Sequence, residues 1–243
     1  MIKDERLNIC ENIQKEVTKN IVENRLIQNN DKIVVAVSGG PDSMCLLTVL
    51  VSLQDVFIKR YGINYELVVA HVNHSIRSES DSEKLYVENT CNELNIPFYY
   101  LKSNVEEIAK EKKMSVEACG REVRYDFFYE IKRKTNANKI AVAHNLNDNV
   151  ETVLLNLIRG CALKGLTGMN FLSNDIIRPL LTIEKKDILE YNIFQNLNPC
   201  FDCTNNENVY LRNKIRNILI PLIEKEYNLS LIHISEPTRL QLI

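Results

Sequence analysis

The sequence lacks several features that point directly to a class of protein. Its 243 residues carry 30 Lys and Arg against 32 Asp and Glu, so a net charge of −2 gives no globally basic surface for nucleic acid. No apolar run approaches the ~20 residues that cross a bilayer, and residues 1–6 lack the apolar core of a signal peptide. A hydrophobic fraction of 45% excludes a disordered or low-complexity chain. We therefore expect a globular, cytoplasmic protein with no membrane partner.

The seven cysteines do not form a metal-binding pattern in the sequence. Their number is odd, their spacing is scattered, and only Cys200 and Cys203 form a C-x-x-C pair. A structural zinc site needs a second such pair or nearby histidines, and the sequence offers neither. In a cytosolic chain such cysteines are typically reduced thiols, so we expect no disulfide framework.

Short β-branched runs alternate with helical patterns along the chain. Strands are expected at residues 32–37, 66–71, 98–101, 139–144 and 176–179. Helices are expected at residues 5–28, 44–57, 80–94, 104–112, 115–134, 148–158, 183–191 and 208–224. This alternation predicts an α/β fold with a Rossmann-like, doubly wound parallel sheet. Right-handed crossovers bring the carboxyl ends of its strands to one edge, where such sheets bind ligands.

Residues 38–43, Ser-Gly-Gly-Pro-Asp-Ser, lie between the first expected strand and a helix. Two glycines let the backbone turn sharply and approach a ligand, while the helix points its positive end at the same place. The segment lacks both the Gly-Lys-Ser/Thr ending of a Walker A loop and the G-x-G-x-x-G pattern of dinucleotide sites. The sequence therefore predicts a phosphate-binding loop of another kind.

Acidic residues near this edge are candidate ligands for a cation. Asp42 is a hard oxygen ligand beside the expected phosphates and is the first candidate for Mg²⁺, with a helix N-cap as the alternative. Asp148 and Glu151 are three residues apart on an expected helix and so share one face. They can hold Mg²⁺ or an amine, unless they form a solvated face, and the sequence leaves open which acid binds which.

Four arginines are spaced to face one way in pairs. Arg121 and Arg124 are three residues apart, and Arg212 and Arg216 are four apart. A guanidinium group suits the phosphates of a nucleotide or of RNA. Ordinary surface arginines are the alternative for each of them.

Residues 38–43 resemble the PP-loop of the N-type ATP pyrophosphatases, which cleave ATP between its α and β phosphates. Further segments resemble the tRNA(Ile)-lysidine synthase family, in its order and spacing: residues 71–77, 117–128, 143–152, 158–169, 177–181 and 210–216. The resemblance implies a ligase that uses ATP and Mg²⁺ to join free L-lysine to C2 of the wobble cytidine of tRNA(Ile) with a CAU anticodon. The reaction would pass through an adenylated tRNA and release AMP and pyrophosphate. A homodimer is also suggested.

The resemblance implies roles for individual residues. The implied ATP-binding residues are Ala36, Ser38, Gly39, Gly40, Pro41, Asp42, Ser43 and His71. The implied residues for tRNA or other substrates are His74, Arg77, Arg124 and Arg216. The implied catalytic residues are Asp42, Arg121, Asp148, Glu151 and Arg212, with Asp42 and Asp148 as metal ligands. The family usually shows two adjacent acids where this chain has Asn147 and Asp148, so only Asp148 is carried over.

Two other functions stay open at this point. A PP-loop tRNA 2-thiolation enzyme uses the same activation with sulfur as the nucleophile, and Cys200 and Cys203 keep that alternative open. A non-catalytic nucleotide-binding module is the second, because Asn147 lacks the charge of the usual acid. Bound iron would favour the first, and ATP binding without turnover would favour the second.

The chain is expected to divide into four parts. Residues 1–30 form an N-terminal helix, residues 31–182 a PP-loop ATP-binding catalytic domain, and residues 183–228 a helical extension of it. Residues 229–243 resemble the translation of a sequencing-library adapter, and we expect them to be a non-native tail. On that expectation the natural sequence is cut short near residue 228.

Overall fold

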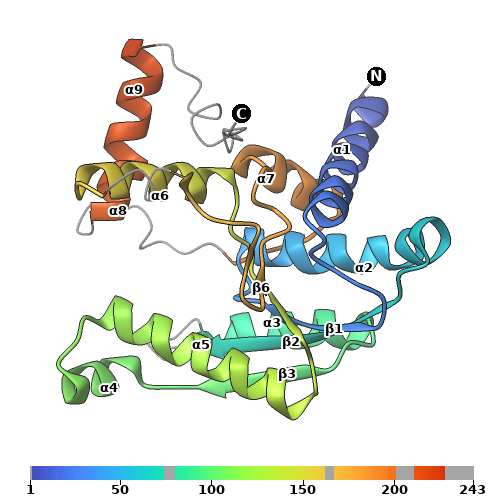
Figure 1. Ribbon diagram of the computed structural model, residues 1–243, viewed down its shortest axis with the longest axis horizontal. Helices are drawn as coiled ribbons and strands as arrows, with labels where there is room; N and C mark the ends of the chain where they lie inside the picture. The colour runs from blue at the N-terminus through green and yellow to red at the C-terminus, as the bar shows by residue number, and fades with distance from the viewer. Residues whose placement is uncertain (1, 74–79, 162–166, 201–210, 228–243) are drawn as a thin grey trace, which may run out of the picture.

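The structure is a computed structural model that describes residues 2–73, 80–161, 167–200 and 211–227 (Figure 1). Within these residues, six strands form one sheet in the order β3-β2-β1-β4-β6-β5. The strands are β1 (Asp31–Ala36), β2 (Tyr65–Asn73), β3 (Phe98–Lys102), β4 (Lys139–Ala141), β5 (Leu172–Ser173) and β6 (Ile176–Ile177). All neighbours are parallel except β5 and β6. The predicted doubly wound parallel sheet is confirmed.

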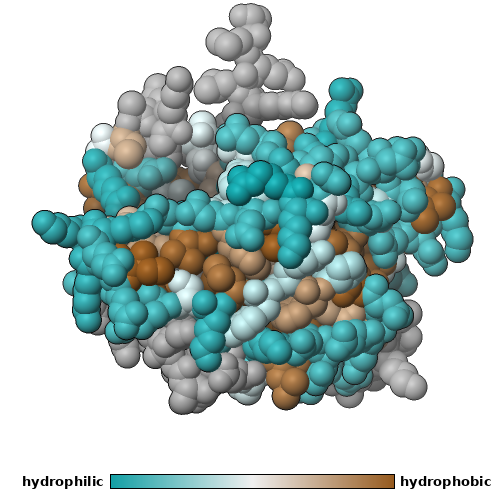
Figure 2. Space-filling model, turned by 90° about the horizontal axis from the view of Figure 1, so that it is seen from below, coloured by the Kyte–Doolittle hydropathy of each residue, from teal (hydrophilic) through white to brown (hydrophobic). Residues whose placement is uncertain are grey.

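Helices cover both faces of this sheet. They are α1 (Ile2–Glu23), α2 (Pro41–Tyr61), α3 (Ser80–Glu93), α4 (Val105–Lys112), α5 (Val116–Lys134), α6 (Leu146–Ile158), α7 (Lys185–Phe194), α8 (Leu211–Lys214) and α9 (Ile220–Tyr227), with a π-helical turn η3 (Ile215–Leu219) between the last two. Figure 1 shows α1, α2 and α7 above the sheet and α4 and α5 below it. Seen from below, the outer surface is mostly hydrophilic, with a band of hydrophobic side chains showing between the polar ones (Figure 2).

Strand β1 is buried on both faces, which explains its uninterrupted β-branched sequence. Ile33 and Val35 pack into the core formed with α1, α2 and α7, while Val34 packs on the other face with Phe128 and Ile131 of α5. The three strand residues are fully buried, and each such side chain contributes roughly 1.5–3 kcal/mol of hydrophobic free energy. The central strand is therefore anchored firmly just before the loop of residues 38–43.

Helix α2 begins and ends at identifiable signals. It starts directly after Gly40 with Pro41 in its first turn, where a missing N–H costs nothing. It ends at Gly62, whose left-handed φ of 65° closes the last turn. The helix thus begins three residues before the expected position 44, because Pro41 is part of the helix and not of the loop.

The same helix corrects the expectation about membrane-length apolar runs. Within the described residues, α2 is long and apolar enough to cross a membrane by length and composition, although half of its apolar window is buried inside the protein. Leu46, Leu47 and Leu50 are fully buried in the core. Its hydrophobicity is accounted for by its position as the central core helix.

The last described helices pack against α6. Ile215 of η3 is buried with Val150 and Leu154 of α6, and α9 stands away from the sheet beyond them (Figure 1). This packing joins residues 211–220 to a helix that starts at the carboxyl edge of the sheet. It brings Arg212 and Arg216 next to the acids of α6.

Candidate functional site

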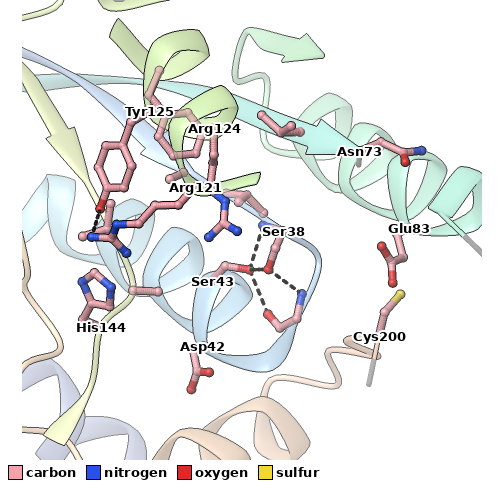
Figure 3. Close-up of a pocket in the computed structure, with 17 residues that line it drawn as sticks. Ser38, Asp42, Ser43, Asn73, Glu83, Arg121, Arg124, Tyr125, His144 and Cys200 are labelled. Atoms are coloured by element: carbon pink, nitrogen blue, oxygen red, sulfur yellow. Dashed lines mark hydrogen bonds between the residues drawn. The ribbon is translucent and has the colours of Figure 1, made fainter. Parts of the chain in front are cut away.

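The loop of residues 38–43 is closed by its own serines at the start of α2 (Figure 3). The Ser43 hydroxyl donates to the Gly40 carbonyl at 2.9 Å and accepts from the Ser38 backbone N–H at 3.1 Å. The Ser38 and Ser43 hydroxyls are also 3.1 Å apart, and the Ser38 hydroxyl accepts from the Gly40 N–H at 3.3 Å. Gly39 takes a φ of +87°, which a side chain would strain. The loop is therefore held in a defined turn at the point where α2 begins.

A cavity of about 420 Å³ opens beside this loop, at the carboxyl ends of β1, β2 and β4. Ala36, Ser38, Gly40, Asp42 and Ser43 all line it. Its volume lies in the range of small-molecule and cofactor sites. Its place, at the carboxyl edge of a parallel sheet, is where such folds bind ligands.

Arginines make one side of the cavity strongly positive. Arg121 and Arg124 reach from α5 toward the loop (Figure 3), and the guanidinium of Arg121 lies 4.9 Å from the ring centroid of Tyr125. Glu83 and Cys200 line the opposite end. Two guanidinium groups facing a helix N-terminus form a site suited to phosphate.

His144 stands among these positive charges as a neutral imidazole. It lines the cavity three residues after the end of β4, and the Nε of Arg178 donates to its Nδ1 at 3.1 Å. Burial, then the charges of Arg178, Arg121, Arg212 and Arg124, lowers the pKa of His144 from 6.5 to about 3. Neither His144 nor Arg178 was among the predicted site residues, although residue 144 ends the strand expected at 139–144 and so lies at the edge where a ligand was expected.

Asp42 lies on the other side of the loop from Arg121 and Arg124 (Figure 3). Its carboxylate accepts from the ammonium of Lys185 at 2.7 and 2.6 Å and from the side-chain amide of Asn145 at 3.1 Å. The N-cap of α2 is Gly40, so the alternative of Asp42 as N-cap is wrong. Lys185 was not predicted, because nothing in the sequence marks it as a partner of a loop 143 residues away.

Asp148 and Glu151 form a largely buried acidic pair on α6. Glu151 is 1% exposed, and it accepts from the Nε atoms of Arg212 at 2.8 Å and Arg216 at 2.5 Å. Asp148 lies 3.4 Å from Arg216 and 3.6 Å from Arg212. Burial, followed by the charge of Glu151, raises the pKa of Asp148. A solvated face is therefore excluded, and both arginines pair with acids in this structure.

One residue links the acidic pair to the loop. The Asn145 side chain accepts from the Asp148 backbone N–H at 3.0 Å, and Asp148 accepts from the Asn145 N–H at 3.2 Å, which makes a capping box at the start of α6. The same Asn145 side chain donates to Asp42. Asn145 thus connects the acidic pair of α6 to the loop of residues 38–43.

The remaining predicted residues do not line the cavity or lie outside the described residues. Gly39 and Pro41 belong to the loop, but they are not among the residues that line the cavity. His71 is 1% exposed and outside that lining, with its Nδ1 at 2.8 Å from the Val37 carbonyl and its ring stacked on Tyr100. His74 and Arg77 lie outside the described residues, as do Cys203 and residues 229–243. No contact of the described cavity supports a nucleotide-binding role for the His71 side chain.

Asn147 has a structural function at the start of α7. Its side-chain carbonyl accepts from the Lys185 backbone N–H at 2.9 Å, at the start of α7. The N-cap of α7, Glu184, makes no side-chain capping bond. Asn147 therefore supplies the cap from outside the helix, and an aspartate oxygen would serve equally well.

Replacing Asn147 by Asp is expected to leave turnover within about twofold, because the acceptor is kept and negative charge at a helix N-terminus is favourable. Asn147→Ala removes the acceptor and loosens the backbone of Lys185, so turnover should fall while stability drops by about 1 kcal/mol. Urea unfolding and AMP release in parallel measure both effects. Equal loss in the two variants would contradict this function of Asn147.

The lowered pKa of His144 predicts a loss of stability in acid. The folded pKa, about 3, lies below the ordinary 6.5, so the unfolded chain binds the proton more readily. The stabilising contribution is present above pH 6.5 and is lost as the pH falls toward 3. Urea unfolding at pH 7.5 and pH 5 should therefore show a smaller acid-induced loss in His144→Gln than in the unchanged protein. Equal losses would contradict a depressed pKa.

Among the described residues, no three His, Cys, Asp or Glu side chains cluster closely enough to hold a metal ion alone. Cys45, Cys91 and Cys119 are fully buried, and Cys200 is partly exposed. A metal here would need ligands from a substrate as well, as Mg²⁺ commonly takes from phosphates.

A family profile and two relatives of known name match most of this chain. The profile of the PP-loop domain family matches residues 9–223. The chain is 45% identical over 219 residues to a tRNA(Ile)-lysidine synthase of Clostridioides difficile, covering 89% of this chain and 46% of that protein. A tRNA(Ile)-lysidine synthase of Petrotoga mobilis is 36% identical, with 89% of this chain and 68% of that protein covered. The chain spans about half the length of the clostridial relative.

A solved structure also shares the fold. The U34-tRNA thiolase NcsA from Methanococcus maripaludis with its [4Fe-4S] cluster superposes with a TM-score of 0.73, at 23% identity. The match covers 93% of this chain and 77% of that one. At this identity, the similarity establishes a common architecture.

Proposed function

The chain belongs to the tRNA(Ile)-lysidine synthase family of PP-loop proteins, and on that premise we propose that it joins free L-lysine to C2 of the wobble cytidine of tRNA(Ile) with a CAU anticodon. ATP supplies the energy, and AMP and pyrophosphate are released. The protein would act in the cytoplasm, and a homodimer remains part of the prediction. Residues 31–182 would carry the nucleotide chemistry, and residues 183–228 would contribute Lys185, Arg212 and Arg216.

The observation that carries this proposal is the meeting of two subsites of opposite charge at Asn145. The loop with Arg121 and Arg124 suits a triphosphate, whereas Asp148 and Glu151 already hold two guanidinium groups and so select cations. Joining a cationic amine to a nucleotide-activated base needs both subsites side by side. A phosphate site alone would suffice for a nucleotide-binding module.

The reaction has two steps in which these residues act. First, the cytidine O2 attacks the α-phosphorus of ATP and the bond to the β-phosphate breaks. The loop N–H groups and Ser43 would hold the departing pyrophosphate, and Arg121 and Arg124 would offset the charge that develops. Second, the lysine ε-amine, in its uncharged form, attacks C2, the bond from C2 to O2 breaks, AMP leaves with that oxygen, and the attacking nitrogen loses a proton to solvent. Glu151 would orient the amine toward C2, so that the two reacting atoms are held in a productive geometry.

The acids present fit a magnesium ion beside phosphates. Asp42 and Asp148 both bond to Asn145, at 3.1 and 3.2 Å, so their carboxylates flank the entry to the loop. Burial, followed by the charge of Glu151, raises the pKa of Asp148, and a cation bound at this carboxyl group would favour its charged form. When bound by Asp42 and Asp148, Mg²⁺ would supply charge neutralisation for the pyrophosphate.

The thiolation alternative has less support. A sulfur-transferring enzyme of this kind needs thiols placed for a cluster or a persulfide. Within the part of the chain that the structure describes, the cavity has one cysteine, Cys200, and no metal-binding group is present. Cys203 lies outside the described residues.

Incubation of the protein with ATP, Mg²⁺, lysine and the tRNA tests the proposal. Release of AMP and pyrophosphate that requires lysine is the expected result. Release that is indifferent to lysine but requires a sulfur donor would favour thiolation. ATP binding without any release of pyrophosphate would favour the non-catalytic module and overturn the proposal for this chain.

A further inference from the structure

His144 and Arg178 leave the sheet side by side from two neighbouring parallel strands. β4 pairs with β6 through Ala141 and Ile177, and the Val142 N–H continues the pairing by donating to the Ile177 carbonyl at 3.0 Å. His144 follows β4 by three residues, and Arg178 follows β6 directly. The contact between their side chains is therefore built into the strand register.

Arg178 is held rigidly in this contact. It is 8% exposed, and its Nη1 donates to the Asn170 carbonyl at 2.8 Å. Its backbone N–H donates to the Phe171 carbonyl at 2.9 Å. Its Nε–H points at Nδ1 of His144 at 3.1 Å.

The direction of this hydrogen bond determines where the imidazole carries its proton. An arginine Nε always bears a hydrogen and cannot accept, so Nδ1 of His144 must present its lone pair. A neutral ring then carries its proton on Nε2. A second proton on Nδ1 would place two N–H groups head to head and break the bond.

The positive charges around the His144 ring also disfavour a second proton on it. Arg121 and Arg124 face His144 from α5, Arg212 faces it from α8, and Arg178 faces it from the end of β6. The acids at this edge are already paired, Asp42 with Lys185 and Asp148 with Arg212 and Arg216. Burial and the charges of these four arginines therefore lower the pKa of the imidazole.

The geometry points to Arg178 as a positioning residue, which fixes His144 as a neutral hydrogen-bond donor and leaves its Nε2–H for an oxygen of the ligand in the cavity. The ring cannot then act as a general base, because its one lone pair is engaged by Arg178. The identity of the ligand, a nucleotide phosphate, rests on the proposed function. The protonation state of the ring does not.

Nitrogen-15 NMR of the histidine side chains tests this inference on the protein alone, with His144→Gln identifying the signals. The expected spectrum has a lone-pair signal for Nδ1 and an N–H signal for Nε2, with no titration between about pH 8 and pH 5. Arg178→Met should give mixed tautomers and titration near about pH 6. Arg178→Gln, whose amide can still donate, should keep the tautomer but titrate at higher pH than the unchanged protein.

A proton on Nδ1 of His144 in the unchanged protein, or a tautomer that does not respond to Arg178→Met, would overturn the inference. If Arg178→Met does not fold, Arg178→Gln and the spectrum of the unchanged protein still decide the matter. Binding of ATP gives a second measurement. The loss of affinity in Arg178→Met, about tenfold at pH 8, should shrink toward pH 5.5 as the released imidazole gains charge. A purely structural function would give a loss that is independent of pH. Because the NMR result needs neither tRNA nor lysine, it stands or fails separately from lysidine formation.

Discussion

Replacing Glu151 by Gln is expected to abolish lysine-dependent AMP release, with a fall of at least about a hundredfold to a thousandfold. The amide keeps the shape of the side chain but cannot attract the ammonium group of lysine, and it cannot neutralise Arg212 and Arg216. Pyrophosphate release should fall much less, because the loop and the arginines of α5 are untouched. Separate assays of pyrophosphate and AMP measure this difference.

The same substitution should destabilise the fold, because it leaves Asp148 as the one carboxylate that pairs with the guanidinium groups of Arg212 and Arg216. Glu151 is buried but each arginine is about a third exposed, so we expect a loss of about 2 kcal/mol, below the cost for a fully buried pair. Glu122→Gln is the matched control, since Glu122 pairs with Lys112 on the exposed surface and should cost less than about 1 kcal/mol. Unchanged AMP release in Glu151→Gln would contradict the assignment of the amine subsite.

The second large effect is expected for Asp42→Asn, which should lower pyrophosphate release by about a hundredfold or more. Asp42 is the acid of the loop, and its charge is balanced by Lys185 in the free protein. An asparagine retains hydrogen bonding to Asn145 but loses the charge that would hold Mg²⁺ beside the phosphates. Turnover measured over a range of Mg²⁺ concentrations should show the defect, and Asp55→Asn, an exposed change on the same helix, is the control.

A double variant separates chemistry from simple charge balance at this site. Asp42→Asn leaves the Lys185 ammonium without its partner, which costs about 1 kcal/mol for a pair that is partly exposed. Adding Lys185→Met removes the unpaired charge and should restore the stability. Turnover should not recover, and a recovered turnover would show that Asp42 serves only to neutralise Lys185.

Local patterns in the sequence were sufficient to predict the parts of the site that follow one another along the chain. A β-branched strand and two glycines identify β1 and the loop, because each residue type has a local conformational reason to be there. The expected start of α2 was three residues too late, because Pro41 belongs to the helix and not to the loop. The three-residue spacing of Asp148 and Glu151 correctly places them together on α6. Strand β5 was missed, because two exposed residues carry no periodicity.

Contacts between distant segments could not be predicted in this way. The spacing of Arg212 and Arg216 showed that they face one way, but not that Glu151, more than sixty positions earlier, would be their partner. The pairs Asp42–Lys185 and His144–Arg178 depend on strand order and on how α7 packs, which no local pattern encodes. The charge balance of the site is therefore a property of the fold.

Mass spectrometry of the wobble nucleoside, after incubation of tRNA(Ile) with the protein, ATP, Mg²⁺ and lysine, tests the central claim most directly. The account predicts a nucleoside heavier than cytidine by one lysine less one water, formed only when both ATP and lysine are present. A nucleoside that has exchanged oxygen for sulfur, or unmodified cytidine from a protein that hydrolyses ATP in the presence of this tRNA, would contradict it.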